Sequence, residues 1–213
     1  AGGAIRWTGF APNIIQSMKI SSVGLKSAIE NGVQHVFVTA WGDGGNECSV
    51  TATYPSLALY ALFDYQGEAH REEISALVKA VTGDPLEMWE TLQLPNYLRD
   101  EQLPYENPSK FCFYQDVLLG ILDSRVKLTF DEQFHEYAQT LKKMAKKSLH
   151  YGYVYQTLAD FCDFLAVKAT LGKRLREAYQ TKDVTGLEDG LERLRLAEKK
   201  LTKFLESFRF QWH

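Results

Sequence analysis

The residues best suited to chemistry follow an apolar run near the N-terminus. Val36-Phe37-Val38 has no polar alternation, which is the pattern of a strand covered on both faces in a parallel sheet. Trp41 and Asp43 come next, in a loop rich in glycine. An indole packs well on the apolar face of a sugar ring, and a carboxylate can accept hydrogen bonds from two sugar hydroxyls. Because residues i and i+2 of an extended chain point to the same side, this spacing predicts a sugar site.

Both residues also have a structural interpretation. A tryptophan after an apolar strand is usually part of the core, although the glycines beside Trp41 leave few side chains to cover it. An aspartate before a glycine commonly forms a turn, so Asp43 stays open between ligand contact and turn formation. Trp7 repeats the arrangement earlier in the chain, because it ends an apolar run and a glycine and a proline follow. We expect Trp7 and Trp41 to lie on one face.

The elements that would position these residues alternate between strand and helix. A strand over residues 4–8, a helix over 22–31 that ends at Gly32, and a strand over 34–40 form a β-α-β unit. A right-handed crossover makes the two strands of such a unit parallel. Tyr54-Pro55 then opens a helix, since proline is tolerated in a first turn.

From residue 67 onward, helical spacing replaces the strand pattern. The apolar spacing between residues 74 and 81 predicts a helix that ends at Gly83. Residues 111–122 predict a helix that is buried on a wide face. Three longer helices follow, with breaks at Gly152 and at residues 181–186, and they read as an antiparallel bundle.

Composition excludes several classes of function. The chain has 213 residues and is 45% hydrophobic, which is enough for one large or two small domains. Its net charge is −3, and no basic stripe mixes with aromatic residues, so we expect no nucleic-acid partner. The apolar runs are far shorter than the roughly 20 residues that cross a bilayer, so we also expect no membrane span. The compartment stays open.

Cofactor and metal chemistry have no sequence signal. The three cysteines are widely separated and odd in number, which predicts buried free thiols. The five histidines lack the spacing of metal ligands, and His35, at the start of a strand, reads as a packed or solvated residue. A dinucleotide fingerprint and a phosphate loop are also missing. We therefore predict no cofactor and no metal.

The sequence resembles a known enzyme family at these residues. V-T-A-W-G-D-G-G-N-E-C-S, residues 38–49, together with W-T-G-F-A-P, residues 7–12, resembles the last two βα units of family 20 glycoside hydrolases, the β-N-acetylhexosaminidases. The resemblance is closest to bacterial exo-β-N-acetylglucosaminidases in which an α-helical domain follows the barrel. It implies an α/β fold followed by an all-α fold: the last two βα units of a (β/α)8 TIM barrel over residues 1–66, and a C-terminal α-helical domain over 67–213.

The resemblance also implies roles for the site residues. In the family, a Trp-x-Glu at the end of the eighth strand forms an indole wall for the 2-acetamido pocket and binds the O4 and O6 hydroxyls. The matching positions are Trp41 and Asp43, so an aspartate replaces the commoner glutamate. We expect Trp41, Asp43 and Trp7 to bind substrate, and the flanking glycines to permit the closer backbone approach that a shorter acid needs. The choice between glucose and galactose configuration stays open.

The implied reaction is retaining and substrate-assisted. The acetamido carbonyl attacks the anomeric carbon, an Asp orients that amide, and a Glu protonates the leaving oxygen. In the family this Asp-Glu pair lies on the fourth strand, which would be upstream of Ala1. We therefore expect no catalytic residue in this chain, and no hydrolysis by this chain alone.

Two strands cannot close a barrel, and their open edges need a cover. We expect the remainder of the chain's own barrel or a neighbouring chain to supply it, and a homodimer is one form of such a neighbour. The expected ligands are glycans that end in N-acetylhexosamine. Two alternatives stay open: a non-catalytic helical module for interaction or dimerisation, and a barrel of another sugar-acting family with a similar loop.

Overall fold

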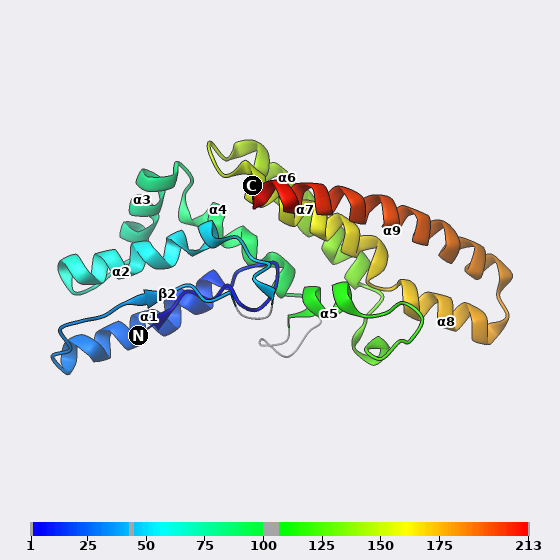
Figure 1. Cartoon of the computed structure of the whole chain (residues 1–213), viewed down its shortest axis with the longest axis horizontal. Helices are drawn as coiled ribbons and strands as arrows, with labels where there is room; N and C mark the ends of the chain where they lie inside the picture. Colours follow the sequence, from blue (N-terminus) through cyan, green and yellow to red (C-terminus); the bar gives the residue numbers. More distant parts are fainter. Residues whose placement is uncertain (1, 43–44, 100–106, 213) are drawn as a thin grey trace. The chain divides into compact units, whose positions relative to one another are not determined.

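The computed structural model describes residues 2–42, 45–99 and 107–212, and these residues are mostly helical (Figure 1). They belong to two compact units: the first has residues 1–94 and 146–152, and the second has residues 95–145 and 153–213. The predicted helical character of the C-terminal part is confirmed. A barrel is not formed within the described ranges, and the predicted domain boundary after residue 66 stays a prediction.

The first unit contains two short strands joined by a helix. β1 (Gly2–Gly3) and β2 (Val38–Thr39) pair in parallel, and α1 (Ile14–Glu30) connects them. Gly2 lies opposite Val38, and the ladder continues with the amide of Ala4, which donates to the carbonyl of Thr39 at 2.8 Å. The predicted parallel β-α-β arrangement is therefore confirmed.

The strand predicted over residues 4–8 is wrong, because β1 lies before this range, and β2 covers only Val38 and Thr39 of the strand predicted over 34–40. Residues 33–37 and 4–8 lie outside any strand. Val36 and Phe37 are exposed, because the described residues supply no further strand beside them. The first run stops for a different reason: the chain turns at Trp7 and Thr8, directly after Arg6 points its side chain into another loop.

The helices of the first unit begin and end for local reasons. α1 starts eight residues before the predicted position, since Ile14, Ser17 and Ser21 continue the buried face that leads to Leu25. α2 (Tyr54–Gln66) opens at Tyr54-Pro55 as predicted, directly after the 3-10 turn η2 (Val50–Thr53).

α3 (Arg71–Thr82) ends at Gly83 as predicted, and the φ of +85° at Gly83 is a conformation that favours glycine. The short helix α4 (Leu86–Glu90) and the 3-10 turn η3 (Thr91–Asn96) follow it.

Trp89 in α4 is the centre of this unit's aromatic core. It is fully buried, and its Nε1 donates to the hydroxyl of Thr82 at 3.1 Å. Its ring contacts those of Tyr54 and Tyr151, at centroid distances of 5.8 and 5.2 Å. Tyr151 comes from the segment 146–152, and its ring contacts are one reason why this segment belongs to the first unit.

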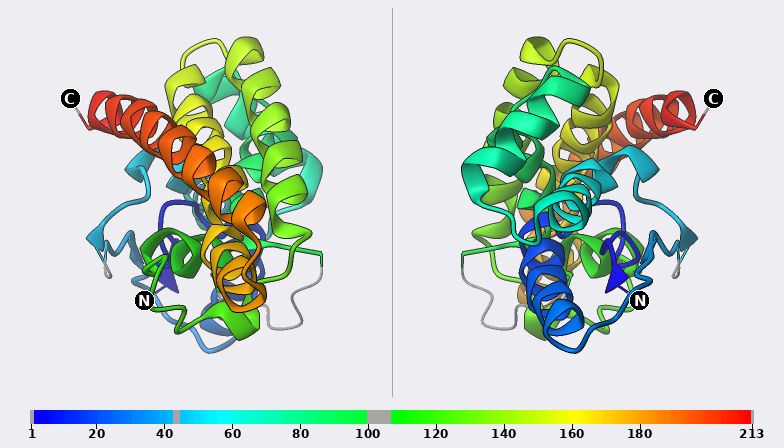
Figure 2. Two further views of the ribbon diagram at one scale, coloured as in Figure 1. Left: turned by 90° about the vertical axis from the view of Figure 1, so that its right-hand side faces the viewer. Right: turned by 90° about the vertical axis from the view of Figure 1, so that its left-hand side faces the viewer.

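The second unit is a helical bundle. α6 (Phe130–Lys147), whose last two residues belong to the first unit, and α7 (Gly152–Lys168) were both predicted. α9 (Val184–Gln211) was also predicted, whereas α8 (Leu171–Thr181), which forms a hairpin with α9 (Figure 1), was not. Figure 2 shows α7 flanked by α6 and α9.

The core of this bundle is aromatic. Phe113, Phe161 and Phe204 come from three different helices, and their ring centroids lie 5.1–5.8 Å apart. Phe161 and Phe204 are fully buried.

The predicted helix over residues 111–122 is wrong. α5 (Pro108–Tyr114) ends at Tyr114, and the 3-10 turn η4 (Asp123–Arg125) follows the loop. Asp116 ends the helical pattern because its Oδ1 accepts from the amides of Leu118 and Leu119, at 2.7 and 2.9 Å. Three of the side chains that were predicted to be buried, Tyr114, Leu118 and Ile121, are exposed.

Candidate functional site

The predicted sugar residues lie around the loop that follows β2. Trp41 is 56% exposed, so its indole is available to a ligand and does not belong to the core. Trp7 is half-buried, and its ring lies against β1: a Cβ added to Gly3 would be 3.2 Å from its Cη2 and Cζ3 atoms. Asp43 lies outside the described residues. The predicted convergence of Trp7 and Trp41 on one face stays a prediction.

Arg6 donates hydrogen bonds to several residues of this loop, a role that was not predicted from the sequence. Its side chain is almost fully buried, at 5% exposure. Nε and Nη2 donate to the carbonyl of Cys48 at 3.2 and 2.6 Å, and Nη1 donates to the carbonyl of Ala40 at 3.3 Å. Nη2 also donates to Oδ1 of Asn46, at 2.5 Å. A charged residue inside the apolar run 4–8 was the only sequence signal for this role.

Asn46 folds the loop back on itself. Its φ of +57° is unusual for a residue other than glycine. A Cβ added to Gly42 would overlap Oδ1 of Asn46, so Gly42 allows the amide side chain to lie against the backbone next to Trp41. The glycine therefore has a steric role at a close approach, in addition to leaving the indole uncovered.

The end of this loop is buried and chemically inert. Burial raises the pKa of the Cys48 thiol to about 12, although Arg6 opposes this and Glu47 adds to it. A thiol with such a pKa is not a nucleophile at neutral pH. Glu47 is also buried, and its carboxylate lies beside Gly45. The described residues of this loop therefore combine an exposed indole at Trp41 with a buried, protonated thiol at Cys48.

Metal binding and membrane insertion gain no support from the described residues. Within residues 2–42, 45–99 and 107–212, no group of three or more His, Cys, Asp or Glu side chains could hold a metal ion. In the same ranges, every helix is too short or too polar to cross a membrane.

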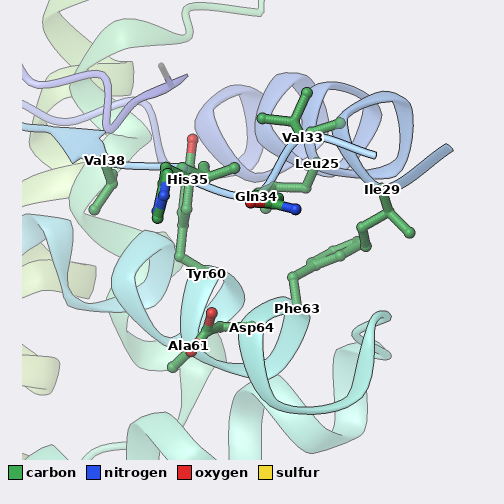
Figure 3. Close-up of a pocket in the computed structure, with 12 residues that line it drawn as sticks. Leu25, Ile29, Val33, Gln34, His35, Val38, Tyr60, Ala61, Phe63 and Asp64 are labelled. Carbon is green, nitrogen blue, oxygen red and sulfur yellow. The ribbon is translucent and has the colours of Figure 1, made fainter. Parts of the chain in front are cut away.

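A groove of about 580 Å³ lies between α1, α2 and the segment 33–38. Figure 3 shows Tyr60 extending from α2 toward His35, and Phe63 extending toward Ile29. His35 is exposed and lines this groove, so it is not packed in a core. The groove follows the same segment that lies outside any strand, which identifies it as an open side of the β-α-β unit.

A second hollow, of about 650 Å³, lies over α6, α7 and α9 in the other unit. Its acidic side chains already have cationic partners: Asp163 pairs with Lys142 at 2.5 Å, and Asp131 pairs with Arg193 at 2.7 Å. These pairs join neighbouring helices, so the hollow is explained by the packing of the bundle.

Comparison with known proteins identifies the family of the helical part. Residues 86–213 match the model of the Glycoside Hydrolase 20C C-terminal domain, and this range is more than half of the chain. No curated protein matches the chain. The matched range starts at α4 and includes the whole second unit. The chain therefore belongs to the family of the glycoside hydrolase 20C C-terminal domain, and its parent is a family 20 glycoside hydrolase.

Proposed function

We propose that this chain is the C-terminal part of a β-N-acetylhexosaminidase that removes terminal, non-reducing N-acetylglucosamine or N-acetylgalactosamine from glycans. The observation that carries the sugar site is the exposed indole of Trp41, in a loop that directly follows β2. Family membership, which rests on residues 86–213, supports the glycosidase parent independently. Trp41 would form a wall for the sugar, and Asp43 and Trp7 would complete the substrate contacts.

The proposed reaction is retaining and substrate-assisted. The carbonyl oxygen of the 2-acetamido group attacks the anomeric carbon while the bond to the leaving oxygen breaks. A glutamic acid donates its proton to that oxygen. Water later attacks the anomeric carbon from the face that the leaving group left, which opens the cyclic intermediate and retains the anomeric configuration. The Asp-Glu pair for these steps would lie upstream of this chain, so the chain by itself would hydrolyse nothing. Its part in the reaction is to bind and orient the sugar.

The remainder of the barrel is the partner that the first unit fits best. The groove between α1 and α2 is lined by apolar side chains, which include Leu25, Ile29 and Phe63. Next to it, Val36 and Phe37 are exposed and lie outside any strand. Additional strands on this side would bury these side chains and complete the hydrogen bonds of the segment 33–37.

The sugar site is tested in the parent enzyme with an aryl N-acetylglucosaminide as substrate. Trp41→Ala should raise KM about tenfold or more, since covering roughly 60 Å² of apolar indole surface at about 25 cal/mol per Å² contributes about 1.5 kcal/mol, a factor of ten. Tyr65→Ala is a matched control, because Tyr65 is an exposed aromatic residue of the same unit. Unchanged kinetics for Trp41→Ala would contradict the site.

The parent's upstream sequence provides a second test of the mechanism. It should contain a strand that ends in Asp-Glu, roughly 100 or more residues before Trp7, given the size of a barrel. A parent without this pair would instead favour a non-catalytic helical module for interaction or dimerisation.

A further inference from the structure

One side chain holds the loop of Trp41 at three places. Arg6 contacts the loop's entry through the carbonyl of Ala40, its middle through Oδ1 of Asn46, and its exit through the carbonyl of Cys48. The three distances are 3.3, 2.5 and 2.6 Å. These residues are 34 to 42 positions away along the chain, so the contacts are tertiary and not a local turn.

These contacts bracket Trp41 on both sides. Ala40, directly before it, accepts from Nη1 of Arg6. Gly42, directly after it, lies against the Asn46 amide that Nη2 of Arg6 holds. The indole itself is more than half exposed, so packing of its own ring fixes it only in part. The backbone at Ala40 and Gly42 therefore determines the direction in which Trp41 points.

The chemistry of this clamp requires an arginine. A guanidinium presents five N–H donors in a rigid, planar fork, and Arg6 uses three nitrogens to reach three separate acceptors. Lysine carries its three donors on one nitrogen and would lose the fixed spacing between the donor nitrogens of the fork. Burial also makes the arrangement expensive to leave incomplete, since an unpaired buried carbonyl costs about 1–3 kcal/mol.

We propose that Arg6 is the positioning residue of the sugar site, which holds Trp41 in the direction needed to contact the sugar. This inference rests on the proposed function, because a positioned indole has a role only if it binds substrate. Arg6 touches the loop and not the ligand, so it acts through Trp41. A loosened loop would hold Trp41 in the binding direction only part of the time, so the apparent affinity for the sugar should fall by that fraction.

The test is a double-mutant cycle in the parent enzyme with an aryl N-acetylglucosaminide. Arg6→Met should raise KM about tenfold or more while kcat changes less. In a Trp41→Ala background, Arg6→Met should raise KM no further, because the residue through which it acts is gone. Arg195→Met is the matched control, since Arg195 is exposed on α9.

Two conservative variants separate positioning from general stability. Arg6→Lys should resemble Arg6→Met, because it keeps the charge and loses the fork. Asn46→Gly removes only the amide that contacts Gly42 and retains a residue that accepts a positive φ, so the buried guanidinium and the fold should persist. It should raise KM in the same direction by a smaller factor. Amide hydrogen exchange at residues 45–48 should accelerate in all three variants at Arg6 and Asn46.

The outcomes distinguish this inference from the function on which it rests. An unchanged KM for Trp41→Ala overturns the sugar site, and the role of Arg6 falls with it. A raised KM for Trp41→Ala, together with an unchanged KM for Asn46→Gly and for folded Arg6→Met, overturns the role of Arg6 alone. Equal effects of Arg6→Met with and without Trp41 would assign Arg6 to general stability and would likewise refute positioning.

Discussion

Lys168 provides the sharpest test of how the second unit is held together. Its Nζ is the donor to three backbone carbonyls, those of Cys112, Phe113 and Gln115, at 2.6, 2.7 and 2.7 Å. These carbonyls belong to the last turn of α5 and the residue after it, where a helix has no intrahelical donors of its own. One ammonium group therefore caps the C-terminus of α5 from the end of α7.

Lys168→Met removes this cap and keeps most of the side chain's volume. Three carbonyls would lose their donor, and each costs about 1–3 kcal/mol if it stays buried. The loss is offset in part because the ammonium is no longer desolvated, so we expect a net loss of about 3 kcal/mol, the lower end of the summed cost of three unpaired carbonyls. Such a change corresponds to about a 100-fold larger opening equilibrium, since 1.36 kcal/mol is a factor of ten.

The assay is amide hydrogen exchange in the parent protein. The amide of Gln115, which donates to the carbonyl of Phe111 at 2.9 Å, reports directly on the end of α5. Its protection should fall about 100-fold in Lys168→Met. Lys199→Met is the control, because Lys199 is exposed on α9. Unchanged protection of α5 in Lys168→Met would refute the argument that the ammonium supports this helix end.

The same residue predicts a dependence on pH. Burial lowers the pKa of Lys168 to about 8, from an ordinary value of 10.5. Between these two values the unfolded chain binds more protons than the folded chain, so stability rises with pH across this window. This pH-linked contribution of Lys168 to the unfolding free energy is fully present above pH 10.5, the unfolded pKa. It is lost as the pH falls to about 8, the folded pKa. Lys168→Met lacks this group, so the difference in unfolding free energy between wild type and variant should grow from about pH 8 to 10.5.

Further predictions concern packing and the thiols. Gly190→Ala should destabilise the α8–α9 hairpin by about 1–3 kcal/mol, because the new Cβ would overlap Cδ2 of Leu175. Gly24→Ala should stabilise α1 by up to about 1 kcal/mol, since nothing lies within 4 Å of the added Cβ. Thermal unfolding measures both signs. Trp89→Phe should cost about 0.5–1.5 kcal/mol in denaturant unfolding, because the hydrogen bond from the indole to the Thr82 hydroxyl is lost while that hydroxyl keeps its backbone partners. A thiol reagent should modify the native protein far more slowly than the unfolded chain at all three buried cysteines, Cys48, Cys112 and Cys162.

Helix positions could be predicted where short-range chemistry decides them. Tyr54-Pro55 opens α2, and Gly83 ends α3, because a proline in the first turn and a left-handed glycine act within a few residues. Apolar spacing was enough for α6, α7 and α9. The short break between α7 and α8 has no glycine or proline, so the sequence offered no signal for it.

The wrong predictions share a different cause. Residues 111–122 have helical spacing, but a side-chain contact from Asp116 and the ammonium of Lys168 end α5 at Tyr114. Residues 34–40 have the composition of a buried strand, yet only Val38 and Thr39 find a partner strand among the described residues. In both cases the outcome depended in part on a partner far away in the sequence, which is Lys168 for α5 and β1 for β2.

In the candidate site, one residue could be predicted from the sequence and the contacts that hold it could not. Residue types placed Trp41 on an exposed loop after a strand, and the structure agrees. The clamp by Arg6 could not be predicted, because it joins residues about 40 positions apart through backbone carbonyls that carry no sequence signature. A charge inside the apolar run 4–8 marks Arg6 as unusual, but its partners are set by the fold and not by the local sequence.

Two independent observations now support a glycosidase. The family match covers residues 86–213, whereas Trp41 and Arg6 lie before this range. The match therefore says nothing about the indole, and the exposed indole says nothing about the helices. Because the two observations share no residues, a failure of Trp41→Ala would remove the sugar site and leave the parent's family unchanged. A sugar site that survives this test would instead make the β-α-β unit and the helical domain parts of one enzyme, with Arg6 as the residue through which the first of them holds its ligand wall in place.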